Sequence, residues 1–292
     1  MVTRTYQLAR EKLYIFSIAY RKAIATCIIG RSKGGRSVSL PQGRISCIIC
    51  AYNEGERIRH VLDAIVGNPI FGEIIVVDDG CTDNTGTQVR AHPNISLVSY
   101  MPNRGKSYAL ARGLLMARCE YIMLLDADLL GLDSRHIEAL AGPVLRESAD
   151  VSISLRGNSL PLYRMIGLDF VSGERVLPRR LLLASAEAIM RLPKWAGEVF
   201  VNQLIIEQSL RLAVVDWPDV SHIPKRLKVG QWQGTVEDLR MIGDALRFLT
   251  PVGVVQQNVA LLRLARPAGA VELGTSMPKR HKHRKIPRAG LK

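Results

Sequence analysis

The sequence predicts an α/β fold in which a mostly parallel central sheet is flanked by helices. From residue 45 onward, short apolar runs rich in β-branched residues alternate with segments of helical periodicity, a pattern typical of parallel sheets. Conspicuous polar clusters follow the ends of the apolar runs, which is where ligands bind in such sheets. We expect helical extensions at the N- and C-terminal ends of this domain.

The alternation is regular in the first half of the chain and less regular in the second. Short apolar runs are typical of buried strands, and the longer segments between them have the 3.6-residue period of helices. We expect strands at 45–50, 73–79, 95–100 and 121–126, with helices at 54–67, 82–92 and 104–119. In the second half we expect strands at 151–156 and 213–220, with helices at 181–193, 198–212, 238–249 and 254–266.

Charge separates two terminal arms from the body of the protein. The chain has 292 residues and a net charge of +14. Residues 1–44 carry nine Lys and Arg against Glu11 alone, and residues 279–292 carry seven with no acid. The body is therefore close to neutral, and we expect no nucleic-acid partner.

The N-terminal arm has the composition of a membrane-surface helix. Residues 6–30 mix apolar side chains with basic ones, as basic amphipathic helices on anionic membranes do. Arg21 and Lys22 interrupt the apolar run, which is too short to span a bilayer. We expect a cytoplasmic protein that docks peripherally at the inner face of the membrane through its arms.

The five cysteines are scattered along the chain, which suits a reducing compartment. Cys47 and Cys50 lie three residues apart on an expected strand, so their side chains face opposite sides of the sheet. We expect two core thiols at these positions and neither a disulfide nor a metal pair.

The segment YIMLLDADLLGLD, residues 121–133, places two carboxylates at the end of an apolar run. In extended chain, Asp126 and Asp128 would face the same side. At about 6 Å and an effective dielectric near 20, they would repel by roughly 3 kcal/mol. A shared proton, an arginine or a divalent cation would offset that repulsion. Alternatively, one Asp is solvated at the strand end and the other starts a turn.

Four polar clusters follow predicted strands and are expected to converge at one edge of the sheet. They occupy residues 52–54, 78–79, 102–104 and 126–128. The carboxyl ends of parallel strands meet at a common edge. This arrangement favours a ligand-binding role for the two aspartates.

Four motifs, in this order, resemble the family 2 glycosyltransferases with the GT-A fold, a Rossmann-like architecture. They are CAYNEGERI (50–58), IIVVDDGCTDNT (74–85), NRGKSYAL (103–110) and LLDADLL (124–130), within a similarity that runs from about Ile45 to Gly230. The resemblance implies a metal-dependent glycosyltransferase of the hexosyltransferase class. It would move a sugar from a nucleotide sugar, most plausibly UDP-linked, to a small phosphorylated, glycan or lipid-linked acceptor.

The resemblance also implies a metal site for Mg²⁺ or Mn²⁺. Asp128 would ligate the metal and act catalytically, Asp126 would approach both the ribose and the metal, and His222 would be a further ligand. The alternative for His222 is a solvated loop side chain. Glu198 would lie near the donor sugar or the acceptor, and it is our candidate base for inverting transfer. Its alternative is a first-turn acid that favours the helix dipole.

The remaining expected site residues would bind the nucleotide sugar. Asp79 would contact the nucleobase or ribose, with a helix N-terminal acid as the alternative, while Asp78 is expected to hold the turn. Lys106 would lie near the nucleotide, with a solvated helix charge as the alternative. Gly173 would let the backbone approach the sugar. The same pocket would be lined by Tyr52, Asn53 and Glu54.

The sequence departs from the family pattern in two places. Cys81 stands where relatives usually have Ser. The Q-x-x-R-W signature of processive synthases is missing, and QWQG at 231–234 does not replace it, so we expect a non-processive enzyme. The region around Glu198 and His222 resembles glucosyl-3-phosphoglycerate synthases and polyprenyl-phosphate sugar transferases more than processive synthases. This similarity is looser than that of the four motifs.

Two other functions fit parts of the sequence. A nucleotidyltransferase could share an α/β nucleotide-binding fold, but CAYNEG offers no Gly-rich phosphate loop. A non-catalytic binder of nucleotides or anionic surfaces would use the basic arms.

For domain organisation we expect a basic helical arm (1–44), a GT-A domain (45–230, with a nucleotide-sugar half at 45–130 and an acceptor half at 131–230), amphipathic helices (231–270) and a basic disordered tail (271–292).

Overall fold

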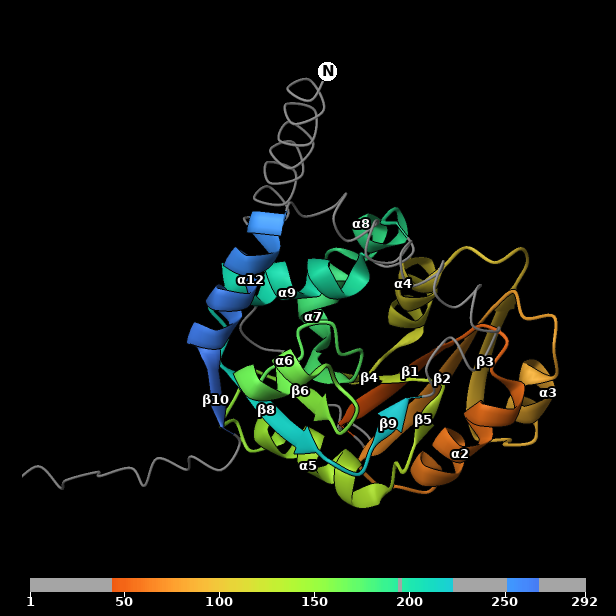
Figure 1. Cartoon of the computed structure of the whole chain (residues 1–292). Helices are drawn as coiled ribbons and strands as arrows, with labels where there is room; N and C mark the ends of the chain where they lie inside the picture. Colours follow the sequence, from red (N-terminus) through yellow and green to blue (C-terminus); the bar gives the residue numbers. More distant parts are fainter. Residues whose placement is uncertain (1–43, 194–195, 223–250, 268–292) are drawn as a thin grey trace, which may run out of the picture.

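Helices cover both faces of a central sheet (Figure 1). Apolar residues that point alternately to the two sides of its strands are buried beneath them. The computed structural model describes residues 44–193, 196–222 and 251–267. These residues form one eight-stranded sheet and a separate two-stranded sheet. In the large sheet only the strand at Arg175–Pro178 pairs antiparallel. The predicted mostly parallel α/β sheet is confirmed.

The first half follows the predicted alternation closely. Each strand is followed by a helix that carries the chain back to the start of the next parallel strand. The elements are β1 (Ile45–Ala51), α2 (Gly55–Ile65), β2 (Phe71–Asp79), α3 (Thr85–Arg90), β3 (Ile95–Tyr100), α4 (Lys106–Met116) and β4 (Tyr121–Asp126).

The second half completes the sheet and adds shorter helices. It begins with β5 (Leu129–Leu130), α5 (Ser134–Leu145), β6 (Val151–Arg156), α6 (Pro161–Ile166) and β7 (Arg175–Pro178). It continues with α7 (Arg179–Leu183), α8 (Ala186–Met190), α9 (Gly197–Glu207), β8 (Leu212–Trp217), β9 (Ser221–His222), α12 (Pro251–Leu264) and β10 (Ala265–Pro267).

Two hydrophobic cores lie on opposite faces of the sheet. In β1, Cys47 and Ile49 pack into the core shared with α2, α3 and α5, whereas Ile48 packs into the core shared with α4, α7, α8 and α9. Cys50 packs against this second core and Cys47 lies in the first. The prediction that these two thiols face opposite sides is confirmed, and both are free.

Three predicted segments differ in detail from the structure. Residues 127 and 128 form a turn directly after β4, so the extended geometry assumed for Asp126 and Asp128 is wrong. The helix predicted at 181–193 is two short helices, because Ser185 leaves the helical conformation with φ −110° and ψ 9°. The helix predicted at 198–212 ends at Glu207, since Ser209 has a left-handed φ of 51°.

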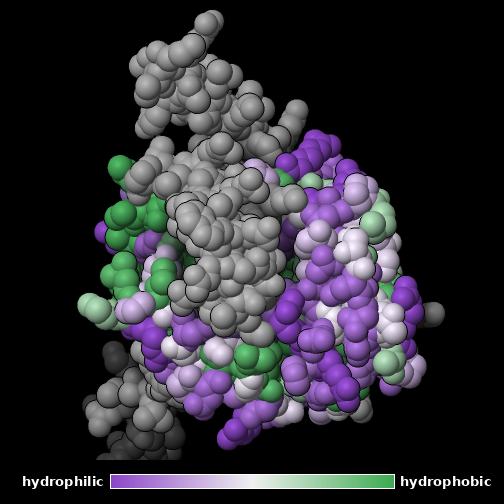
Figure 2. All heavy atoms as spheres, turned by 45° about the vertical axis from the view of Figure 1, so that its right-hand side comes forward, coloured by the Kyte–Doolittle hydropathy of each residue, from purple (hydrophilic) through white to green (hydrophobic). Residues whose placement is uncertain are grey.

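The helix predicted at 254–266 is present as α12, but it ends at Leu264, and residues 265–267 form β10. The basic arms, the helix predicted at 238–249 and the QWQG segment fall on residues outside the described ranges. Among the residues that the structure describes, no helix has both the length and the apolar character that crossing a membrane requires. Figure 2 shows a mainly hydrophilic surface on the side that carries α2 and α3, as expected for helices that bury one face against a sheet.

Candidate active site

The candidate active site lies where the order of strands in the sheet reverses. From β1 the chain continues to β2 and β3 on one side, and then returns to β4 on the other side of β1. The carboxyl ends of β1 and β4 meet in register, with Cys50 opposite Asp126. Such a switch point leaves a crevice in which open α/β sheets bind ligands.

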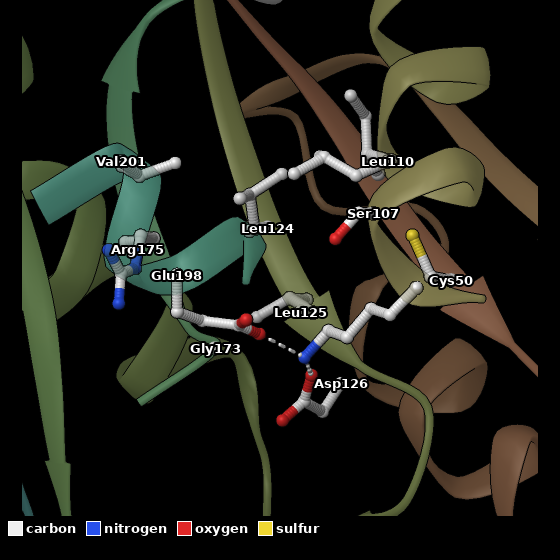
Figure 3. Close-up of a pocket in the computed structure, with 13 residues that line it drawn as sticks. Cys50, Ser107, Leu110, Leu124, Leu125, Asp126, Gly173, Arg175, Glu198 and Val201 are labelled. Atoms are coloured by element: carbon white, nitrogen blue, oxygen red, sulfur yellow. Dashed lines mark hydrogen bonds and ion pairs between the residues drawn. The ribbon is translucent and has the colours of Figure 1, made fainter. Parts of the chain in front are cut away.

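Lys106 joins two acidic side chains in this crevice. Its Nζ atom lies 2.7 Å from Asp126 Oδ1 and 2.8 Å from Glu198 Oε1, and Figure 3 shows these carboxylates facing each other. Burial works to lower the pKa of Lys106, but the two carboxylates outweigh it, so the pKa lies well above its ordinary value. Lys106 is therefore a charged residue of the crevice rather than a solvated helix charge.

The carboxylate of Asp126 is held from three directions. Lys106 contacts one oxygen, and Arg156 Nη1 lies 3.7 Å from the other. On the third side, a Cβ atom at Gly173 would lie 2.6 Å from Oδ1 and 2.8 Å from Oδ2. Gly173 thus makes room for Asp126, and its predicted approach to the sugar stays a prediction.

Lys106 and Arg156 are the cations that offset the repulsion expected between Asp126 and Asp128. Burial tends to raise the pKa of Asp126, but Lys106 and then Arg156 bring it well below its ordinary value. Asp128 also contributes to raising the pKa of Arg156, so the arginine interacts with both carboxylates. Arginine was one of the three partners expected from the sequence, and it is present at 3.7 Å, but the nearer cation is Lys106 at 2.7 Å.

A buried ion pair beneath Asp126 was missed in the sequence. Arg156 Nη1 lies 2.9 Å from Glu174 Oε1. The fully buried Glu174 also accepts hydrogen bonds from the hydroxyls of Ser154 and Ser172, at 2.8 and 2.6 Å. Burial raises the pKa of Glu174, and Arg156 opposes that rise. Arg156 ends the apolar run that begins at Val151, so the strand-end rule applied to the first four strands would have found it.

A small cavity adjoins the Lys106 bridge. Its volume is about 30 Å³, room for roughly two water molecules. The thiol of Cys50 lines it, and burial raises the pKa of that thiol to about 12. Cys50 was expected to be a core thiol, and the structure places it at the edge of the site. Apolar walls come from Ile48, Leu110, Leu124, Leu125 and Val201, and Arg175 also lines the cavity.

Hydrogen bonds join the loops after β1 and β2 at the same edge. Asn53 Oδ1 accepts from Thr82 N at 2.8 Å, and Asn53 N donates to Cys81 Sγ at 3.2 Å. The backbone N–H of Glu54 donates to Thr85 Oγ1 at 2.9 Å. The expected convergence of the polar clusters is confirmed, and Cys81 acts as a small hydrogen-bonding residue.

Asp79 organises the entry to α4. Its buried carboxylate accepts from the side chain of Asn103 at 2.9 Å and from the backbone N–H groups of Arg104 and Gly105, each at 2.8 Å. This geometry supports the helix-entry alternative, while the predicted contact with a nucleobase or ribose stays a prediction. Asp78 accepts from Cys81 N at 2.8 Å and holds the turn, as expected.

Tyr52 and Glu54 occupy different environments in the loop after β1. The side chain of Tyr52 is exposed, with 49% of its surface accessible, and the residue directly follows the carboxyl end of β1. The carboxylate of Glu54 forms an ion pair with Arg57 in the first turn of α2. Their predicted role in nucleotide binding stays a prediction.

Asp128 and His222 lie on adjoining segments. Asp128 is in the turn after β4, and the next residue, Leu129, pairs with His222 across the antiparallel β5–β9 sheet. Asn158 Nδ2 donates to the carbonyl oxygen of His222 at 2.9 Å and lies 3.3 Å from its Nδ1 atom. The structure therefore brings His222 to the β4 turn, although the two are distant in sequence.

The residue types at this turn suit a divalent cation. Carboxylate oxygens are the ligands that Mg²⁺ and Mn²⁺ prefer, and imidazole is a common additional ligand. Asp126, Asp128 and His222 are on neighbouring segments, but within the described ranges no three Cys, His, Asp or Glu side chains are clustered closely enough to hold a metal ion. The predicted metal site stays a prediction that rests on donor chemistry and on the proximity of these segments.

The sheet has the GT-A glycosyltransferase fold. Its crevice lies at the switch point, with one acidic residue at the end of β4 and another at the start of α9. A comparison of structures agrees. Glucosyl-3-phosphoglycerate synthase from Mycobacterium tuberculosis, in complex with Mn²⁺, UDP and phosphoglyceric acid, is similar with a TM-score of 0.55 and 24% identity. The match covers 75% of this chain and 84% of that chain. At this identity the likeness shows the fold.

Within that class, residues 46–161, which are less than half of the chain, match the model of glycosyl transferase family 2. Dolichyl-phosphate beta-glucosyltransferase ALG5C of Trichomonas vaginalis is 33% identical over 150 residues, which are 42% of this chain and 44% of the relative. The uncharacterized glycosyltransferase YaiP of Escherichia coli is 39% identical over 97 residues, 32% of this chain and 24% of the relative. The chain thus matches less than half the length of these curated relatives.

Proposed function

We propose that the chain is a metal-dependent, non-processive glycosyltransferase that uses a nucleotide sugar. The Lys106 bridge carries the proposal, because it gathers Asp126 and Glu198 into one crevice at the switch point. Lys106 and Asp126 were expected to lie near the nucleotide, Glu198 was expected near the donor sugar or the acceptor, and the three residues come from three separate elements. A fold that only used this edge for packing would not need three charged side chains there.

A UDP-linked donor and a phosphorylated acceptor are supported by the relatives. The similar solved structure holds Mn²⁺, UDP and phosphoglyceric acid, and the T. vaginalis relative is named for a dolichyl-phosphate acceptor. Both named acceptors carry phosphate. We propose an acceptor of this chemistry, small or lipid-linked, bound by residues of the half at 131–230.

In the proposed transfer, an acceptor hydroxyl oxygen bonds to the anomeric carbon while the bond from that carbon to the diphosphate breaks. UDP leaves with the bonding electron pair. If the transfer inverts, Glu198 takes the proton released by the hydroxyl. A bound divalent cation would neutralise the charge that develops on the diphosphate.

The chain's own residues would bind and orient the reactants. Asp128, Asp126 and His222 are the residues that would hold the cation. Lys106 would donate to the diphosphate, because an ammonium group is a strong partner for phosphate oxygens. Tyr52, Asn53, Glu54, Asp79 and Gly173 would line the nucleotide-sugar pocket.

For the whole chain we keep the proposed division into a GT-A domain at 45–230 and basic arms at 1–44 and 279–292. The arms account for all of the net positive charge, so we propose that they attach the protein peripherally to anionic membranes. Co-sedimentation with anionic liposomes at two salt concentrations checks this. Equal binding after deletion of residues 1–40 and 279–292 would contradict it.

The experiment that tests the function combines two measurements on the full chain. UDP with Mn²⁺ or Mg²⁺ should raise the melting temperature more than either alone, because only the native state binds them together. A panel of nucleotide sugars should then reveal one donor that is slowly hydrolysed. If no nucleotide changes the melting temperature and no donor is consumed, the proposed function is wrong.

A further inference from the structure

The end of β6 contacts both segments that would hold the cation. Arg156 Nη1 lies 3.7 Å from Asp126 Oδ2. Two residues later, Asn158 donates to the carbonyl oxygen of His222 at 2.9 Å. Because Asp126 ends β4 and His222 lies in β9, the three residues 156–158 connect two parts of the proposed site that are otherwise distant in sequence.

This short segment is fixed by the interior of the protein. Gly157 N donates to the carbonyl oxygens of Trp217 and Val220, at 2.8 and 3.0 Å. A Cβ atom at Gly157 would lie 1.9 Å from the carbonyl oxygen of Pro218, so a larger residue would push the segment away from β8. The position of the segment is therefore set by the fold.

Arg156 is held as firmly as the backbone that carries it. Its side chain is 8% exposed and pairs with the fully buried Glu174 at 2.9 Å. A second carboxylate, Asp169, lies 3.7 Å from its other terminal nitrogen. With these partners the guanidinium has little freedom, and it presents a fixed positive group to Asp126.

We infer that Arg156 and Asn158 are positioning residues that set where Asp126 and His222 lie relative to each other. The inference rests on the proposed function, since it concerns the metal-dependent binding of the donor diphosphate. Neither residue is assigned a contact with the sugar. Residues that orient metal ligands typically change metal affinity 10–100-fold when they are replaced.

Asn158→Ala is the cleanest test, because Asn158 is exposed and its loss opens no cavity in the core. Isothermal calorimetry with UDP, with and without Mn²⁺, gives the two Kd values. We expect the Kd of UDP with Mn²⁺ to rise about tenfold, while the Kd without metal and the melting temperature stay unchanged. Asn68→Ala is the matched control, because the Asn68 side chain also bonds a loop backbone group, accepting from Ile70 N before β2, and both Kd values should match wild type.

Arg156 needs a paired variant, because Arg156→Met alone would leave Glu174 buried without its cation. Arg156→Met combined with Glu174→Gln removes both charges and keeps similar volumes. We expect UDP with Mn²⁺ to bind about tenfold more weakly to this variant. A purely electrostatic role predicts the opposite sign, because removing a cation beside Asp126 would favour the binding of another cation.

The outcomes separate the inference from the function on which it rests. If UDP binding by the wild type does not respond to Mn²⁺, the proposed function fails and the inference fails with it. If the wild type responds and Asn158→Ala binds as wild type does, the inference alone is overturned. Should the paired variant not fold, the comparison of Asn158→Ala with Asn68→Ala still decides.

Discussion

The Nζ atom of Lys106 lies 2.7 Å from Oδ1 of Asp126, and this ion pair ties the first residue of α4 to the last residue of β4. The same ammonium group reaches Glu198 in the first turn of α9. One cation therefore stabilises two carboxylates that would otherwise repel each other in a partly buried crevice. When a diphosphate binds, we expect the ammonium to turn toward the phosphate oxygens.

Lys106→Met should both destabilise the protein and reduce its activity. Asp126 and Glu198 lose their shared cation, and removing one partner of a partly buried charged group costs about 1–3 kcal/mol. Thermal melting should show a drop of several degrees, and donor turnover should fall about 100-fold. Arg59→Met is the control, because Arg59 forms only an exposed pair with Asp63 at 3.7 Å, worth less than about 1 kcal/mol. Equal melting of Lys106→Met and wild type would contradict the structural role of the bridge.

The two aspartates should respond differently to neutralisation. Asp126→Asn removes the carboxylate shared by Lys106 and Arg156, so it should lower the melting temperature by a few degrees. Asp128→Asn should lower the melting temperature less than Asp126→Asn does, because Asp126 is the carboxylate that pairs with Lys106 at 2.7 Å. Both variants should lose Mn²⁺-dependent binding of UDP. Full activity in Asp128→Asn would rule out the proposed metal ligand.

Gly173→Ala should displace Asp126. The new Cβ atom would lie 2.6 Å from Asp126 Oδ1, and relieving such an overlap costs about 1–3 kcal/mol. We expect UDP with Mn²⁺ to bind at least about tenfold more weakly. Gly142→Ala on α5 is the control, since the nearest atoms to its Cβ belong to the guanidinium group of the exposed Arg146, which can move away. Wild-type affinity in Gly173→Ala would show that Asp126 tolerates the shift.

Cys50 should resist alkylation in the folded protein. Burial raises the pKa of its thiol to about 12, and the thiolate, which is the reactive form, is populated only as pH rises toward that value. At pH 8 the thiolate fraction is about 1000-fold lower than for an ordinary thiol. Mass spectrometry after iodoacetamide treatment, with and without urea, measures the protection of Cys50. Equal labelling in both conditions would contradict the buried position of the thiol.

Local residue patterns predicted six of the eight strands of the large sheet, but not β7 or β10. The strands at 45–50, 73–79, 95–100 and 121–126 were found within two residues of their ends, because each apolar run has a period that only its own residues determine. The opposite orientations of Cys47 and Cys50 followed from the same two-residue period. The helix predicted at 181–193 failed because Ser185 breaks it in a way that apolar spacing does not reveal.

The sequence by itself determined the class of fold and the edge at which polar residues gather, because strand order along the chain and the residues at strand ends are local properties. Only the tertiary structure decided the partners at that edge. Lys106 meets Asp126 and Glu198, and Arg156 meets Glu174, through crossovers that bring distant segments together. Such ion pairs depend on distances between elements, and residue spacing along the chain does not encode those distances.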